Sequence, residues 1–252
     1  MRLVVLAFMA LAALLGGVSL ALLAVFLYLG SFELVPLGLS AGPSLAFDTL
    51  LCGIFFAQHS LMIRRPFRRR LIGALPDRFH PALYSIASGA TLLVLLLLWQ
   101  RSEALVFFVG GPVRWILRAV FAAAVLGFAL TARSLRAFDP FGLRPLYAHL
   151  RGHGQPAMPL TIEGMYRWVR HPLYTLSLVL FWASPDLTLD RTLFATLWTA
   201  WVVIGARLEE HDLVEDFGDA YRAYQRSTPM LIPWRLPHAR PAPAGIDDDS
   251  VG

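Results

Sequence analysis

Arg170-His171-Pro172-Leu173-Tyr174 begins an apolar segment of this chain, and Glu209-Glu210 ends the apolar segment that follows. The two hydrophobic runs, at about 172–185 and 191–208, are separated by the polar residues 185–190. Two helices joined by a short turn run antiparallel, so their outer ends lie side by side. We therefore expect the Arg-His pair and the two glutamates to meet at one membrane face. Such a cluster suits a small zwitterionic ligand better than a lipid.

The composition is typical of a polytopic membrane protein. Hydrophobic residues make up 57% of the chain and charged residues only 15%, with a mean hydropathy of +0.58. Soluble domains are usually about 45–50% apolar and about 25% charged. Crossing the hydrocarbon layer takes about 20 apolar residues, and four further runs are close to or above that length: 3–29, 44–63, 82–99 and 113–131. The first run is too long for a signal-peptide core, so we expect it to be retained.

The hairpin after Arg170 decides the number of spans. Its first arm, 172–185, would be about 21 Å long as a helix, which is shorter than the hydrocarbon layer of about 30 Å. We therefore predict an all-α membrane helix bundle of five to six spans, with a cytoplasmic C-terminal interfacial segment.

The chain divides into four parts by composition. Residues 1–131 hold the N-terminal transmembrane helices, 132–171 a cytoplasmic connecting loop with a turn at Phe138–Gly142, 172–234 the hairpin and the C-terminal segment, and 235–252 a tail predicted to be disordered. Within the third part, Leu208–Arg226 is predicted to form one amphipathic interfacial helix, because apolar residues recur at helical spacing.

The arginines predict the orientation. All 22 basic residues are arginine, and 18 of them fall at the chain start, in the 64–80 and 132–171 loops or in the C-terminal segment from Arg207 onward. The other four are Arg101, Arg114, Arg118 and Arg191. Because cytoplasmic loops of membrane proteins are enriched in arginine and lysine, we expect both termini to be cytoplasmic, in a bacterial inner membrane. Topology explains the basic charge without a nucleic-acid partner.

Several motifs together resemble one family of membrane enzymes. They are Gly164-x-Tyr166, Arg170-His171-Pro172-x-Tyr174, Glu209-Glu210, Gly218-x-x-Tyr221-x-x-Tyr224 and Pro229-Met230-Leu231-Ile232-Pro233. This ordered set resembles the C-terminal core of the isoprenylcysteine carboxyl methyltransferase-like family. Upstream, Gln58-His59-Ser60-Leu61-Met62 and Phe138-Asp139-Pro140-Phe141-Gly142 look like its bacterial methanethiol S-methyltransferase branch.

The resemblance implies S-adenosylmethionine as methyl donor and a small thiol as acceptor, with methanethiol converted to dimethyl sulfide. The sequence departs from the family pattern at Leu176, where the family usually has glycine. Glycine would allow a close approach of the cofactor, so we expect the packing around the cofactor to differ here. The residues that we expect to bind the cofactor are Tyr166, Arg170, His171, Tyr174, Glu209, Glu210, Tyr221 and Tyr224.

His59 is the predicted catalytic residue. It lies about one turn before the cytoplasmic end of the second span, where an ionisable residue is a functional candidate. An alkyl thiol with a pKa of roughly 8.5 needs help to ionise, and His59 is placed to act as the base. A hydrogen bond to a neighbouring helix is its structural alternative. No metal site is expected, because the loop residues His80, His149 and His153 lack ligand spacing.

Two other functions remain open from the sequence. One is methylation of an isoprenylcysteine carboxylate or another lipid, which needs a lateral opening between the spans. The other is a non-enzymatic membrane accessory protein of nitrogen-oxide or haem metabolism, with His59 as a haem ligand. The sequence leaves the oligomeric state open.

Overall fold

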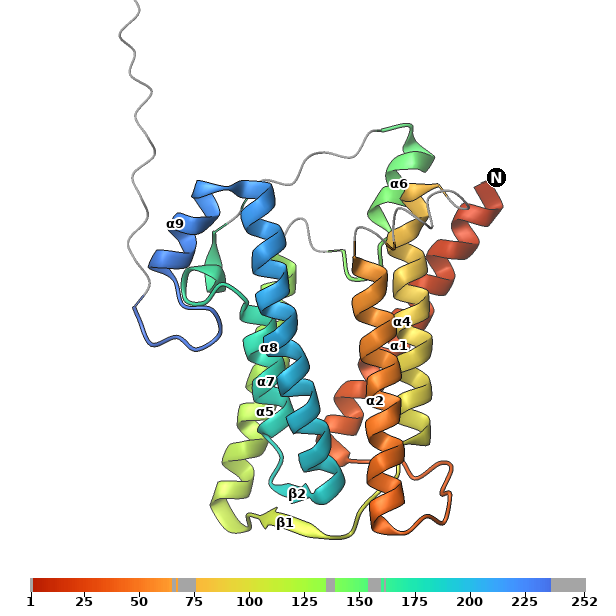
Figure 1. Cartoon of the computed structure of the whole chain (residues 1–252), viewed down its shortest axis with the longest axis vertical. Helices are drawn as coiled ribbons and strands as arrows, with labels where there is room; N and C mark the ends of the chain where they lie inside the picture. The colour runs from red at the N-terminus through yellow and green to blue at the C-terminus, as the bar shows by residue number, and fades with distance from the viewer. Residues whose placement is uncertain are drawn as a thin grey trace, which may run out of the picture.

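The helices form two groups that stand side by side (Figure 1). The structure, a computed structural model, describes residues 2–64, 67, 76–134, 139–153, 160 and 162–236. One group contains α1 (Arg2–Leu29), α2 (Ala41–Ile63) and α4 (His80–Leu98), and the other contains α5 (Gly111–Ser134), α7 (Pro172–Trp182) and α8 (Leu189–Phe217). Helices α2 and α8 make contact between the groups.

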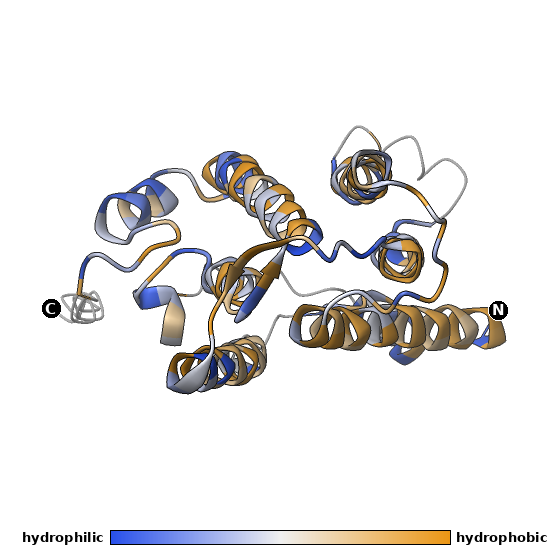
Figure 2. Ribbon diagram, turned by 90° about the horizontal axis from the view of Figure 1, so that it is seen from below, coloured by the Kyte–Doolittle hydropathy of each residue, from blue (hydrophilic) through white to orange (hydrophobic). Residues whose placement is uncertain are grey.

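Within the described residues, four helices are long and apolar enough to cross a membrane: α1, α2, α5, and α4 together with the 3-10 turn η1 (Asp77–Phe79) that precedes it. They coincide with the four apolar runs predicted outside the hairpin. Figure 2 shows hydrophobic residues along the whole length of α1. The chain is therefore a polytopic helical membrane protein, as the composition predicts.

The two arms of the hairpin differ in length. Helix α7 has 11 residues, about 16 Å at 1.5 Å per residue, and ends at Trp182 rather than near 185. Helix α8 has 29 residues and continues past Leu208 to Phe217. The predicted single helix over Leu208–Arg226 is wrong. Its first part, Leu208–Phe217, continues α8 without a break, and the helix is interrupted at Gly218. Gly218 has a φ of +56°, and α9 (Asp219–Ser227) begins after it.

A short β-ribbon joins the two helix groups at the end opposite α9 and the N-terminus (Figure 1). Strand β1 (Leu105–Phe108) pairs antiparallel with β2 (Asp186–Thr188), so that Phe107 lies opposite Leu187. The all-α prediction did not include this ribbon. Its strands are only 4 and 3 residues long, too short for an alternating pattern to be recognised.

The predicted connecting loop 132–171 contains helical segments. They are the last turn of α5, the short helix α6 (Arg144–Arg151) and the 3-10 turn η2 (Gly164–Arg167). The predicted turn is present where it is described, because Gly142 N donates to Asp139 O over 3.2 Å. Gly142 has a φ of +65°, and a Cβ there would lie 2.2 Å from Pro81 C. Glycine is thus required where this turn touches the start of α4.

Some predictions fall outside the described residues. These are the arginines at 65, 68, 69, 70 and 136, the turn residue Phe138, and the part of the predicted disordered tail from 237 to 252.

Stacked aromatic rings fill the space between the two helix groups. Trp198 of α8 stacks on Phe194, with ring centroids 4.7 Å apart, and on Phe55 of α2 at 5.1 Å. Trp201 stacks on Phe56 at 4.8 Å. This aromatic layer lies about two to four turns from Glu209 along α8 and sets the spacing between α2 and α8 there.

Candidate functional site

The Arg-His motif meets the glutamate pair where α7 begins. Arg170 Nε lies 2.5 Å from Glu210 Oε1, and His171 Nε2 lies 3.3 Å from the same oxygen. The three side chains are only 6–12% exposed. The hairpin therefore brings together the groups that the sequence places at its two outer ends.

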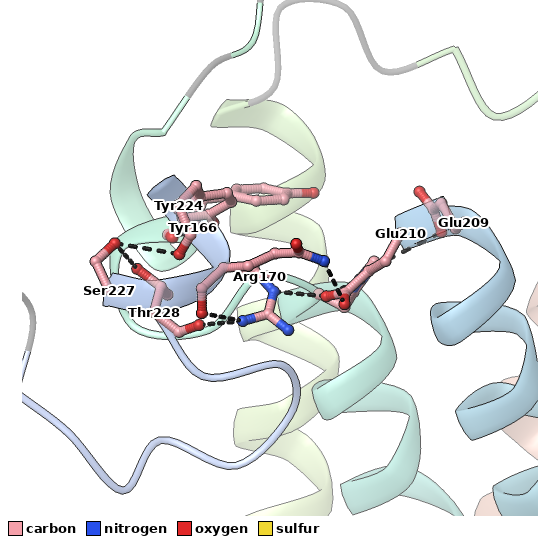
Figure 3. Close-up of polar contacts among 9 residues, drawn as sticks. Tyr166, Arg170, Glu209, Glu210, Tyr224, Ser227 and Thr228 are labelled. Atoms are coloured by element: carbon pink, nitrogen blue, oxygen red, sulfur yellow. Dashed lines mark hydrogen bonds and ion pairs between the residues drawn. The ribbon is translucent and has the colours of Figure 1, made fainter. Parts of the chain in front are cut away.

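Arg170 also fastens the C-terminal segment to this cluster (Figure 3). Its Nη1 donates to the carbonyl oxygen of Gln225 over 3.0 Å and to that of Thr228. The backbone N–H groups of Arg170 and His171 donate to Pro229 O and Met230 O over 2.9 and 3.1 Å. These contacts fold the segment after α9 back onto the start of α7, and Arg170 acts as the organiser of the site.

Glu210 is held as a carboxylate. Burial raises its pKa, but hydrogen bonds from His171 and Arg170, the Arg170 charge and the Gln225 amide lower it to a net value of about 2. Gln225 Nε2 donates to Glu210 Oε2 over 3.1 Å. Both carboxylate oxygens are therefore occupied by protein groups, so Glu210 shapes the site from behind.

Glu209 approaches the other nitrogen of the His171 ring, with its Oε2 3.8 Å from Nδ1, and is much more accessible, with 47% of its side chain exposed. The Tyr174 hydroxyl donates to Glu209 Oε2 over 2.8 Å. The His171 ring stacks on the Tyr174 ring, with 5.4 Å between centroids and 11° between planes. The Tyr174–Glu209 hydrogen bond thus joins α7 to α8, and the Glu209 carboxylate remains accessible to solvent.

A cavity of about 340 Å³ opens beside this pair, and we call it the tyrosine cavity. Its volume lies within the 300–1,000 Å³ that is typical of small-molecule sites. Seven of the eight predicted cofactor-binding residues line it, and Glu210 supports it from outside. The lining comprises Leu160, Tyr166, Arg170, His171, Leu173, Tyr174, Glu209, Leu213, Tyr221 and Tyr224.

The tyrosines of this cavity are uncharged phenols. Burial and the nearby Glu209 charge raise the pKa of Tyr166 to about 12. Burial also raises the pKa of Tyr221 and of Tyr224. The Tyr224 hydroxyl donates to the carbonyl oxygen of Tyr166, and the Tyr221 and Tyr224 rings meet edge to face at 5.8 Å. Together they form an aromatic wall with fixed ring orientations.

A second cavity, of about 330 Å³, lies between α2 and α8, and we call it the α2–α8 cavity. Tyr174 and Glu209 line both cavities. Their hydrogen bond is therefore the wall between two adjacent chambers. The other lining residues are His59, Ser60, Ile63, Arg64, Trp201, Val202, Ile204, Gly205, Leu208 and Asp212.

His59 lines the α2–α8 cavity as a partly buried side chain. Its Nε2 forms a hydrogen bond with the Tyr84 hydroxyl of α4. Its Nδ1 is buried and has no hydrogen-bond partner within the described part of the chain. Next to it, the Trp201 indole N–H donates to Ser60 Oγ over 3.2 Å. The ring is thus oriented by one partner and keeps one nitrogen unpaired.

Sequence reasoning missed Tyr84, Trp201 and Gly205. A signal for Tyr84 was available: the second and third predicted spans, 44–63 and 82–99, run antiparallel, so the last turn of the one lies level with the first turns of the other. His59 and Tyr84 are both about one turn from the connected helix ends. The sequence carried no such signal for Trp201 and Gly205. They lie in a long apolar helix, and the helices packed around it determine which of its faces borders a cavity.

Leu176 lines neither cavity. It points at Gly127 of α5, where an added Cβ would lie 3.3 Å from a Leu176 methyl carbon. The glycine at 127 makes room for the leucine at 176, so the departure from the family pattern is absorbed in the α5–α7 contact.

Comparison with known proteins agrees with the motifs in the sequence. A family model described as NnrU protein matches residues 49–228. The chain belongs to the NnrU family. This family membership confirms the resemblance to isoprenylcysteine methyltransferase-like proteins drawn from the motifs. The matched region contains α2 from residue 49 onward, all the residues of both cavities, and α9.

Two bacterial relatives of this NnrU-family chain carry the name methanethiol S-methyltransferase. The protein from Mycobacterium tuberculosis is 34% identical over 200 residues, covering 78% of this chain and 80% of the relative. The protein from a Pseudomonas species is 34% identical over 210 residues, covering 80% of each. Nurim from the rat is 29% identical over 189 residues, covering 68% of each. No solved structure matches the chain.

Proposed function

We propose that this membrane protein is an S-adenosylmethionine-dependent methyltransferase that methylates the sulfur of a small thiol, converting methanethiol to dimethyl sulfide. The observation that carries the proposal is the pair of cavities with a common wall at Tyr174 and Glu209. Methyl transfer needs two ligands held in line, and two adjacent chambers supply two binding places.

The tyrosine cavity fits a cationic methyl donor. A sulfonium carries a positive charge, and Tyr166, Tyr221 and Tyr224 offer aromatic faces that attract cations. Glu209 adds an accessible negative charge. Arg170 is already engaged by Glu210 and by two backbone carbonyl groups, so we assign it to positioning the C-terminal segment.

The α2–α8 cavity fits the acceptor. The thiolate sulfur donates an electron pair to the donor methyl carbon, and the electrons of the broken bond return to the donor sulfur, which becomes a neutral thioether. Because a negative and a positive charge disappear together, an apolar chamber favours this step. We propose that His59 takes the thiol proton, because a buried nitrogen without a hydrogen bond is costly and a ligand would satisfy it.

The proposed location is a bacterial inner membrane, with both termini and both cavities on the cytoplasmic side. The N-terminus and α9 lie at the same end of the molecule (Figure 1), and most arginines of the sequence belong to that side. A phosphatase that is active only in the periplasm should be inactive when it is fused to the C-terminus, because the fusion would remain in the cytoplasm. An active fusion would contradict this orientation and the access of the donor from the cytoplasm.

The central experiment separates donor binding from turnover. Calorimetric titration of the purified protein with S-adenosylhomocysteine should show binding, and membranes supplied with S-adenosylmethionine and methanethiol should release dimethyl sulfide. His59→Ala should slow release far more than it weakens binding. His211→Ala is the matched control, because His211 is 76% exposed and lines neither cavity.

Two results would redirect the assignment. Methylation of a prenylcysteine analogue, without dimethyl sulfide, would favour a lipid-like acceptor. A haem absorbance band in a protein that does not bind S-adenosylhomocysteine would favour the accessory role.

A further inference from the structure

Gly205 lies in the interior of α8, where glycine is unfavourable. A glycine inside a helix destabilises it by about 0.5–1 kcal/mol relative to alanine. Some other helical glycines of this chain are explained by close packing. At Gly89, an added Cβ would lie 2.7 Å from the Leu15 backbone, and at Gly16 it would lie 2.7 Å from Ser85 Oγ.

Gly205 has no such explanation. An added Cβ there would have no other atom within 4 Å, and its φ is not positive. Backbone geometry and helix packing would therefore both accept a larger residue. What Gly205 does border is the α2–α8 cavity, so the space that a side chain would fill is cavity volume.

The helix spacing shows where in the cavity this space lies. Residues four apart lie on the same face of a helix, so Gly205 lies between Trp201 and Glu209, which also line the cavity. Glu209 belongs to the wall shared with the tyrosine cavity. A side chain at 205 would thus occupy the part of the chamber next to the place where the methyl group must pass.

The rim of the same cavity carries exposed apolar side chains. Ile63, Ile204 and Leu208 line it and are 52%, 55% and 42% exposed. At the polar end, Arg64 Nη1 lies 3.5 Å from Asp212 Oδ2, which links α2 to α8. An uncharged, short-chain thiol is soluble in the hydrocarbon layer and matches this lining.

We propose that Gly205 sets the upper size limit of the methyl acceptor, and that the α2–α8 cavity takes uncharged short-chain thiols. This inference rests on the proposed function and deepens it, because it names the residue that determines acceptor size. Alanine at 205 would remove room for about one methyl group, and leucine would fill the chamber beside the shared wall.

The test is a comparison of Gly205→Ala and Gly205→Leu with wild type, using methanethiol, ethanethiol and butanethiol as acceptors. Gly205→Leu should lose about tenfold or more of its turnover with methanethiol, since one methylene in a pocket changes rates by about 10–200-fold. Gly205→Ala should keep methanethiol turnover and lose the longest acceptor that wild type accepts. In both variants, the affinity for S-adenosylhomocysteine should stay within about twofold.

Gly53→Leu is the matched control. Gly53 also lies inside a membrane helix with nothing within 4 Å of an added Cβ, but it is exposed and lines neither cavity. Its acceptor profile should equal that of wild type.

Three outcomes would overturn the inference. They are an unchanged acceptor profile in Gly205→Leu, an equal loss in Gly53→Leu, and a loss of S-adenosylhomocysteine affinity that matches the loss of turnover. Failure of the proposed function looks different: the wild-type protein itself would then neither bind S-adenosylhomocysteine nor methylate any thiol. Methylation of a prenylcysteine analogue by the wild-type protein would also overturn the inference, because that acceptor is not a short-chain thiol.

Discussion

The two ends of the molecule use acidic side chains differently. At the ribbon end, Asp190 is 1% exposed and accepts hydrogen bonds from Trp99 Nε1, Ser102 N and Thr188 Oγ1, over 3.3, 3.2 and 2.6 Å. At the cavity end, Glu209 accepts from Tyr174 and is 47% exposed. The Asp190 carboxylate is fully engaged in hydrogen bonds within the chain, whereas the Glu209 carboxylate can still accept a hydrogen bond from a ligand.

The loops at the ribbon end show the same structural use of polar groups. Asp48 Oδ1 accepts from the backbone N–H of Gln100 over 2.9 Å. The Gln100 side chain in turn accepts from Leu37 N over 2.9 Å and donates to Val35 O over 3.1 Å. These bonds fasten the connection between α1 and α2 to the end of α4. A polar side chain of this molecule thus marks a site only where the space beside it is open.

The largest expected effect is that of Arg170→Ala at the cavity end. Removing one partner of a buried ion pair costs about 3–5 kcal/mol, and here the C-terminal segment also loses its anchor. Both the thermal stability and the affinity for S-adenosylhomocysteine should fall, as measured by melting and calorimetry. Arg222→Ala is the control, because its ion pair with Asp219 is exposed. Equal behaviour of the two variants would mean that the cluster is only an interfacial anchor.

Asp190→Ala should remove the hydrogen bonds that Asp190 accepts at the ribbon end and lower the stability, without changing ligand binding at the cavity end. A buried donor left without a partner costs about 1–3 kcal/mol, so denaturation in detergent should show a loss of that order. The folded variant should bind S-adenosylhomocysteine with wild-type affinity. A weakened affinity at full stability would show that the two ends are coupled, and the contrast drawn between them would then fail.

The contribution of Glu210 at the cavity end to stability should depend on pH. The folded pKa of Glu210, about 2, lies below the ordinary value of 4.5 for a glutamate, so its stabilising contribution is present above pH 4.5 and is lost as the pH falls toward 2. The difference in melting temperature between wild type and Glu210→Gln should therefore be constant above about pH 5 and shrink below it. A difference that is the same at pH 3 and pH 7 would contradict this explanation.

The smallest effect is expected at the polar end of the α2–α8 cavity. The Arg64 and Asp212 side chains are 35% and 42% exposed, and ion pairs of this kind contribute about 0–1 kcal/mol. Arg64→Gln should change the stability by less than about 1 kcal/mol and leave donor affinity unchanged. A loss as large as that of Arg170→Ala would move this pair from the rim into the site itself.

The sequence predicted the spans and the meeting of the two motifs well. Apolar length is a local property, so the four helices long enough to cross coincide with the predicted runs. The encounter of Arg170 with Glu210 follows from chain connectivity, because the hairpin turn returns the chain to its starting face. The end of α8 was misplaced because the apolar run stops near Leu208 while helix-forming residues continue to Phe217.

Composition, span length and motif order were thus fixed by the sequence alone, since each depends on residues near one another in the chain. Only the tertiary structure decided that Tyr84 orients His59, that Gly127 receives Leu176 and that Gly205 borders open space. Each of these depends on the distance between side chains of different helices, which the rotation and spacing of the packed helices set. A cavity is the space that packing leaves unfilled, so no single helix encodes it.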